Sequence, residues 1–206
     1  MARTPFLTPS TIADAALRLG DREGGEAMTM RRIAGELGCD PMALYRHFPD
    51  RMALLDAVAD LALTAVPSPD PALPWDERLR RVADDIRAAA LAHPGIAGHV
   101  AARPPLAEQG QRIGAGVFAA LGDAGLAPAE ATRAAQALVA TIAAGLAMAV
   151  RAGTRDARWH QVSDVLGGLP SAPPGGELHT VGSEEQFSYT VRLLVAGIRA
   201  EAAGSA

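Results

Sequence analysis

Residues 29–51 read TMRRIAGELGCDPMALYRHFPDR, and this stretch decides the fold of the N-terminal part of the chain. Thr29 favours a helix N-cap, and Ile33 and Leu37 after it belong to an apolar stripe at helical spacing. Gly38 stands where a tight turn requires a positive φ. Asp40, followed by proline at the first helical position, begins a second short helix. The stretch therefore predicts two helices joined by a tight turn.

A helix-turn-helix of this kind places its second helix in the major groove of DNA. The predicted second helix, 42–48, buries Leu44 and turns its other side chains outward, where Tyr45 and His47 can donate to phosphate oxygens. Arg31 can reach a guanine edge, and Arg51 begins the next helix, where a phosphate can be held. The alternative is an ordinary surface hairpin of two helices. The predicted DNA-binding residues are Thr29, Arg31, Arg32, Pro41, Met42, Ala43, Tyr45, Arg46, His47 and Arg51.

The stretch G-C-D-P-M-A-L-Y-R-H-F-P-D-R-M-A-L-L-D-A, from Gly38 to Ala57, strongly resembles the recognition helix and following helix of TetR-family transcriptional regulators. That family usually has a small residue at the position of Ala43, then L-Y-x-H-F, then a basic residue where Arg51 stands. The resemblance covers roughly residues 8–62. It implies an N-terminal domain that binds operator DNA.

The composition limits the classes of protein that remain. Of 206 residues, 49% are hydrophobic but only 4% are aromatic, which favours helices over sheets. The net charge of −4 argues against a protein that coats nucleic acid without specificity, so DNA affinity would depend on a few placed arginines and helix termini. Cys39 is the single cysteine, which excludes a disulfide within the chain; a small core residue is favoured over a redox-sensing thiol. We find no signal-peptide or transmembrane pattern and expect a cytoplasmic protein without a membrane.

The rest of the chain predicts an all-α fold of two parts. Four prolines in VPSPDPALP, 66–74, exclude a helix there and mark a boundary. We expect an N-terminal three-helix helix-turn-helix domain at 1–50, a linking helix at 51–66 and a helical effector-binding and dimerisation domain at 75–206. Further helices are predicted at about 8–22, 75–92, 96–102, 106–121, 128–153 and 184–203, with a loose arm at 1–7 and a loop at 167–183.

The C-terminal part resembles the effector domain of the tetracycline-repressor subgroup. The resemblance lies in W-D-E-R-L-R-R from Trp75, H-P-G from His93, H-V-A-A-R-P from His99, and F-x-x-x-V-x-L-L-V-x-G-I from Phe187. It implies a homodimer in which the last two long helices of each subunit form a four-helix bundle. Small residues would allow those helices to approach closely, although an ordinary core explains the same pattern. The predicted interface residues are Ala143, Ala147, Val191, Leu194 and Ile198.

The same resemblance implies a ligand pocket in this domain. Its lining would be mainly apolar with one polar group, so we expect a mainly apolar small-molecule effector. His99 stands where that subgroup helps bind a drug-chelated metal, but a hydrogen-bonded structural histidine is the alternative. The predicted ligand-binding residues are Val82, Ile86, His99, Val117, Phe118, Leu138, Ile142 and Leu146.

Catalysis and cofactors find no support in the sequence. There is no G-x-S-x-G, no H-E-x-x-H and no glycine-rich phosphate loop, and His93, His99 and His160 lack the i, i+4 spacing of a helix-borne metal site. We therefore predict no enzyme, no cofactor and no metal. The predicted function is a one-component repressor that a small-molecule effector releases from its DNA operator. The alternative is a helical ligand-binding or scaffold module of the same fold without specific DNA binding.

Overall fold

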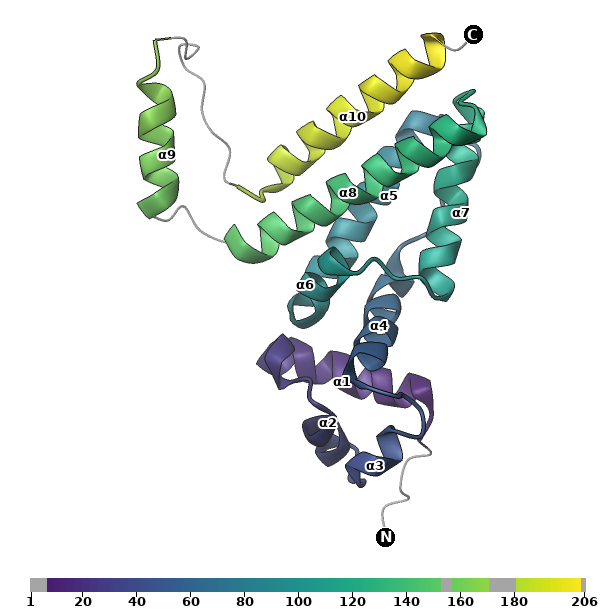
Figure 1. Cartoon of the computed structure of the whole chain (residues 1–206), viewed down its shortest axis with the longest axis vertical. Coiled ribbons are helices and arrows are strands. Elements are labelled where there is room, and N and C mark those ends of the chain that lie inside the picture. The colour runs from purple at the N-terminus through teal and green to yellow at the C-terminus, as the bar shows by residue number, and fades with distance from the viewer. Residues whose placement is uncertain (1–6, 153–156, 171–180, 205–206) are drawn as a thin grey trace.

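The computed structural model describes residues 7–152, 157–170 and 181–204, and within these ranges the regular secondary structure is entirely helical. The predicted arm at 1–7 and loop at 167–183 lie mostly outside the described residues. Figure 1 shows a small helical head at one end of the molecule and a larger helical body at the other. The elements are α1 (Pro9–Glu23), η1 (Gly25–Ala27), α2 (Met30–Glu36), α3 (Pro41–Leu44), α4 (Arg51–Ala62), η2 (Leu63–Ala65), α5 (Trp75–Leu91), α6 (Pro94–Ala102), α7 (Glu108–Asp123), α8 (Pro128–Ala152), α9 (Ala157–Gly167) and α10 (Glu184–Gly204).

Side-chain caps begin the helices of the head where the sequence predicts them. The hydroxyl of Thr29 accepts from the Arg32 N–H at 3.3 Å, and Asp40 Oδ1 accepts from the Met42 N–H at 2.7 Å. Asp50 caps α4 in the same way, and Gly38 has a φ of +64° in the turn between α2 and α3. Each cap satisfies an N–H group that would otherwise lack a partner. The helix-turn-helix is therefore specified locally.

The second helix of this motif is shorter than predicted. We expected 42–48, whereas regular α-helix ends at Leu44. The N–H groups of His47 and Phe48 both donate to the Leu44 carbonyl, at 2.9 and 3.0 Å, so the chain continues as a tight turn. That turn still presents Tyr45 outward beside α3.

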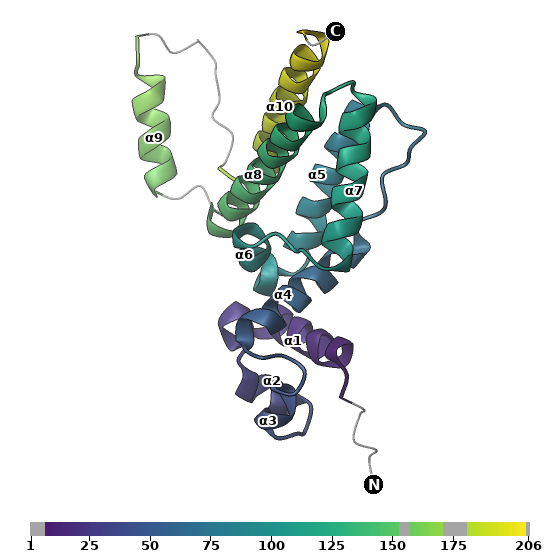
Figure 2. The ribbon, with the colours of Figure 1, turned by 45° about the vertical axis from the view of Figure 1, so that its right-hand side comes forward.

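The body is a bundle around α8, which packs against α5, α6, α7 and α10. Figures 1 and 2 show α8 in the middle of the body, with α10 along one side of it and α7 along the other. Both views place α9 apart from the bundle. Helix α9 was not predicted from the sequence, and α6 begins at Pro94, earlier than the predicted start at Ile96.

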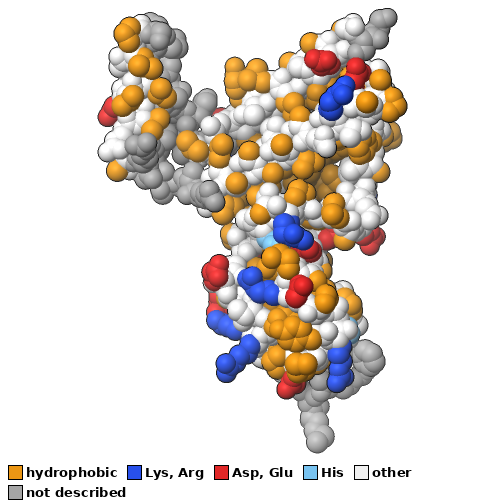
Figure 3. Space-filling model, viewed as in Figure 1, with side chains coloured by type: hydrophobic (Ala, Val, Ile, Leu, Met, Phe, Trp, Pro, Cys, Tyr) orange, Lys and Arg blue, Asp and Glu red, His pale blue; other side chains and the backbone are white. Residues whose placement is uncertain are grey.

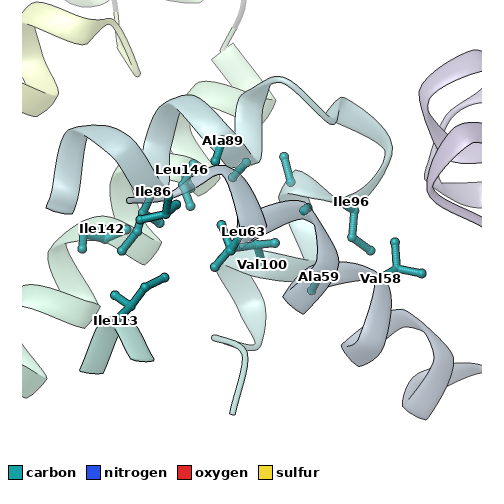
Figure 4. Packing of buried hydrophobic residues seen from close by; sticks show 14 of the residues in the cluster. Val58, Ala59, Leu63, Ile86, Ala89, Ile96, Val100, Ile113, Ile142 and Leu146 are labelled. Atoms are coloured by element: carbon teal, nitrogen blue, oxygen red, sulfur yellow. The ribbon is translucent and has the colours of Figure 1, made fainter. Parts of the chain in front are cut away.

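One apolar core extends from the head into the body. Figure 4 shows Val58 and Ala59 of α4 near Ile96 of α6, and Leu63 and Val100 further along the same core. Helix α4 belongs to the head at its start and to the body at its end, so its buried side chains join the two parts in one core. A movement of the body can therefore reach the head through packed side chains.

The start of α6 also touches the head directly, backbone against backbone. Gly95 lies so close to Gly20 that a side chain at Gly95 would overlap the Gly20 backbone, and a Cβ at Gly25 would lie 2.6 Å from the Gly95 carbonyl oxygen. Beside this contact, His93 Nδ1 and Asp21 Oδ2 are 2.8 Å apart. A side chain at Gly25 or Gly95 would prevent this close contact of the two main chains.

Candidate functional site

The predicted DNA-binding residues lie around the N-terminus of α2 and along α3. Leu44 is fully buried and anchors α3, while Met42 and Tyr45 are 67% and 44% exposed. Arg46 and His47 are exposed in the turn after α3, as are Thr29 and Arg31 at the start of α2; Pro41 and Ala43 are half-buried. Figure 3 shows basic side chains over this end of the molecule. The motif therefore presents donors and apolar contacts on one exposed end of the head.

The arginines of the head differ in their availability. Arg32 pairs with Glu23 at 2.6 Å, and Arg22 pairs with Glu36 at 2.9 Å. Among the described residues, Arg31 and Arg46 have no acidic partner within ion-pair distance. Since an arginine that is already paired must give up its partner to bind a phosphate, Arg31 and Arg46 are better placed for DNA than Arg32.

Arg51 is turned into the domain. Its Nε donates to the Met28 carbonyl at 2.7 Å and its Nη2 donates to the Gly25 carbonyl at 3.2 Å. These bonds join the start of α4 to the connection between α1 and α2, so the geometry favours a structural role. The phosphate contact predicted for Arg51 has no support from this geometry and stays a prediction. The sequence could not show this because both acceptors are backbone carbonyls more than twenty residues earlier.

A cavity of about 160 Å³, partly open to solvent, lies between α5, α6, α7 and α8. Seven of the eight predicted ligand-binding residues line it: Val82, Ile86, Val117, Phe118, Leu138, Ile142 and Leu146. The sequence analysis missed Leu63, Val100, Pro104, Pro105, Gly110, Ile113, Gly114, Ala135, Val139 and Ala143. Every lining residue is apolar or glycine, so only backbone groups are available to a polar part of a ligand.

The prediction for His99, the eighth expected ligand contact, is corrected by the structure, because His99 does not line this cavity. Its Nε2 donates to Asp56 Oδ1 of α4 at 2.7 Å, and Arg103 holds the same carboxylate with Nε at 3.0 Å and Nη2 at 2.9 Å. The structural alternative for His99 is therefore the better interpretation. No signal in the sequence links Asp56 to His99, since 43 residues separate them.

The Arg103 guanidinium beside Asp56 lowers the pKa of that carboxyl to about 2, with a further contribution from His99. A lowered pKa means that the ionised pair stabilises the fold above the ordinary carboxyl pKa, near 3.9, and that this stabilisation is lost as the pH falls through about 2. The junction of α4 and α6 therefore keeps its charge in mild acid.

We expect a carbon-13 NMR titration of the aspartate carboxyls to show Asp56 still ionised at pH values where ordinary aspartates are protonated. Arg103→Gln removes the largest cause of the shift, so the midpoint should rise toward the ordinary value, near 3.9. Asp70→Gln is the matched control, because Asp70 belongs to the loop before α5 and its carboxylate accepts from the nearby Ala72 N–H. An ordinary midpoint for Asp56 in the unmutated protein would contradict the assignment.

The predicted dimer residues need a correction. Val191 and Ile198 are 1% and 5% exposed, so they face the core of their own chain, and Ala143 lines the cavity. Ala147 and Leu194 are half-buried. The opposite stripe of α10 carries exposed Tyr189, Leu193, Ala196 and Gly197, beside exposed Ala140, Ala144 and Met148 of α8.

Apolar surface is also unusually extensive along α8. By length and composition, Pro128–Val150 is the one helix of the described chain that could cross a membrane, with a mean hydropathy of 1.5. Only 22% of its most apolar window is buried in a single chain, and Figure 3 shows hydrophobic side chains over this face of the body. Because α8 packs on four other helices, we interpret it as a core helix whose outer side needs a further partner.

Nothing in the described ranges indicates a metal centre: no three His, Cys, Asp or Glu side chains there lie close enough together to hold an ion. The site consists instead of an exposed helix-turn-helix, an apolar cavity and the helix α4 that connects them.

Comparison with known proteins assigns the class. Residues 12–58 match the family described as "Bacterial regulatory proteins, tetR family", and residues 68–202 match "Tetracyclin repressor-like, C-terminal domain". The chain belongs to the TetR family of bacterial regulatory proteins.

Among curated relatives, the chain is 36% identical over 106 residues to the HTH-type transcriptional repressor DrrR1 of Streptomyces coeruleorubidus, covering 50% of this chain and 38% of that one. It is 38% identical over 104 residues to the class A tetracycline repressor from transposon 1721 of Escherichia coli, covering 48% and 47%. The chain thus spans about half or less of these relatives.

Solved structures match over nearly the whole chain. Apo ActR from Streptomyces coelicolor superposes with a TM-score of 0.83 at 28% identity, covering 96% of this chain and 98% of that one. ActR in complex with actinorhodin superposes with a TM-score of 0.79 at 29% identity, covering 96% and 99%. The likeness of both domains at once supports the arrangement of head and body described above.

Proposed function

We propose that this chain is a homodimeric, one-component transcriptional repressor of the bacterial cytoplasm, released from operator DNA by a small apolar effector. The main support for the proposal is that a DNA-binding surface and a ligand cavity are joined by one continuous apolar core. The exposed helix-turn-helix can bind the major groove, and the apolar cavity can bind a ligand. Helix α4 shares its core with both, so occupation of one site can change the other.

Support for the ligand class comes from the cavity lining. No polar side chain lines it, so each buried polar group of a ligand that finds no backbone partner would weaken binding. We therefore infer an uncharged, mainly apolar effector. ActR has been crystallised with actinorhodin, an organic molecule, in a chain of similar shape, which supports the assignment of this domain to effector binding.

Support for the dimer comes from the exposed α8 and α10 stripe. This stripe is rich in small residues that allow close helix approach. A second copy of the chain would cover it and would bring two heads to two half-sites of an operator.

A mobility-shift titration with the DNA upstream of the gene tests the proposal. We expect Tyr45→Ala and Arg31→Ala each to weaken binding by about 1–3 kcal/mol, because each removes an exposed donor without disturbing the core. Arg81→Ala is the matched control, since Arg81 is an exposed arginine of α5 that pairs with Glu77. Equal affinities for all four proteins, or no shift at all, would refute DNA binding through this surface.

A further inference from the structure

The connection between α6 and α7, together with the first turn of α7, is fixed to helix α4 at both ends; we call this segment, residues 103–110, the α6–α7 strap. At its first end, Arg103 donates two hydrogen bonds, of 3.0 and 2.9 Å, to the Asp56 carboxylate. Bidentate pairs of this kind hold both direction and distance. The start of the strap therefore moves with α4.

At its second end, the strap is held by Asp60. Oδ1 of Asp60 accepts from the N–H groups of Gln109 and Gly110, at 3.0 and 3.1 Å. These groups belong to the first turn of α7, whose own N-cap residue, Ala107, makes no side-chain cap. Asp60 thus caps α7 from a different helix, and its negative charge lies at the positive end of the α7 dipole.

The middle of the strap is part of the ligand cavity. Pro104, Pro105 and Gly110 all line it. Gly110 lies against the Pro105 carbonyl so closely that a Cβ at Gly110 would overlap that group. Since the two prolines fix their own φ angles, they limit how far the strap can bend when a molecule presses on it.

We propose that Asp56 and Asp60 transmit occupation of the cavity to the DNA-binding head, with Asp60 as the residue that couples α7 to α4. The two carboxylates lie one helical turn apart on α4, so they share a face of that helix. Displacement of the strap pulls on both and tilts α4, which begins in the head at Arg51. This inference rests on the proposed function, to which it adds two positioning residues.

The coupling role proposed for Asp60 can be measured, because binding at two coupled sites is thermodynamically linked. A residue that only stabilises the fold changes the affinity of every variant equally, whereas a coupling residue changes how strongly one site responds to the other. The test therefore needs an occupant of the cavity. Gly114 supplies one, because it lines the cavity and a Cβ built there meets nothing within 4 Å.

In the experiment, Gly114→Phe fills part of the cavity from α7, and Gly122→Phe is its matched control. Gly122 belongs to the same helix, is exposed and also has free space around its Cβ, but it does not line the cavity. The position of the head is measured by pulsed electron spin resonance between nitroxide labels at Cys39, the single cysteine, and at Ala88→Cys on α5. An excess of unlabelled protein restricts the measurement to distances within one chain.

We expect Gly114→Phe to shift the distance between the labels by a few ångströms and to weaken operator binding about tenfold, within the range of known allosteric couplings. Adding Asp60→Asn, which keeps the size of the side chain but removes its charge, should abolish the shift in distance and reduce the loss of affinity to less than twofold. Gly122→Phe and the control Asp70→Asn should leave the distance unchanged.

Two results would overturn the inference: no shift in Gly114→Phe, or the same shift with Asp60→Asn present. If Asp60→Asn unfolds the protein, Asp56→Asn replaces it in the same comparison. The distance is measured without DNA. A protein whose head moves as expected but which binds no operator would refute the proposed function and support the coupling.

Discussion

Leu193→Arg should convert the protein from a dimer to a folded monomer and reduce operator affinity at least about a hundredfold, the range in which linked binding sites exceed single ones. Leu193 is 57% exposed in the single chain and lies at the centre of the α10 stripe, one turn from Tyr189. A dimer through this face would bury the new guanidinium without a partner, which opposes association strongly. The monomer should keep its fold, because Val191, Val195 and Ile198 form the core on the other side of the helix.

Light scattering measures the mass, and circular dichroism measures the helix content of the same samples. Leu106→Arg is the control: Leu106 is 85% exposed on the α6–α7 strap, far from α10 in sequence and outside the α8 and α10 stripe. Ile198→Arg should instead unfold the protein, since Ile198 is 5% exposed. A single-chain mass for the unmutated protein would refute the dimer.

Magnesium–tetracycline should bind this protein at least about a hundredfold more weakly than an uncharged apolar dye such as Nile red. Each polar group that loses its water without a new partner costs about 1–3 kcal/mol, and a metal-chelating drug carries several such groups. The cavity offers them no polar side chain. His99 cannot supply one, because Asp56 already holds its Nε2.

Calorimetry with magnesium–tetracycline and fluorescence titration with Nile red measure the two affinities. We expect His99→Ala to leave Nile red binding unchanged and Gly114→Phe to reduce it, since Gly114 lines the cavity and His99 does not. Submicromolar binding of magnesium–tetracycline that disappears in His99→Ala would show that the histidine serves the ligand after all.

The parts of this molecule that the sequence predicts correctly are those with local causes. Thr29, Asp40 and Asp50 cap helices within three residues of themselves, and Gly38 adopts the positive φ that its turn requires. The order of helices follows in the same way from apolar periodicity and from prolines. Seven cavity residues were predicted because the inward stripe of a helix can be read from its spacing.

The contacts that the sequence does not predict depend on partners distant in the chain. His99 and Arg51 have ordinary neighbours in sequence, and only the folded chain brings Asp56 and the Met28 carbonyl to them. The predicted interface residues differ from the exposed α8 and α10 stripe for another reason. Helices α8 and α10 are apolar around most of their circumference, so the pattern cannot tell which side faces the chain's own core. Judged by sequence alone, Val191 and Leu193 are equally good interface residues. Only the structure shows that Val191 is buried and Leu193 exposed.

The contact of Gly95 with Gly20 and Gly25 decides how stiff the joint between head and body is. Where side chains separate two helices, part of any push is absorbed as rotamers change and gaps close. Here the main chain of α6 contacts the main chain of α1 directly, so no side chain between them can absorb a push. A displacement of α6 can therefore act on α1 directly through the main chain. An alanine at Gly25 or Gly95 would force these two main chains apart, far from both DNA and ligand.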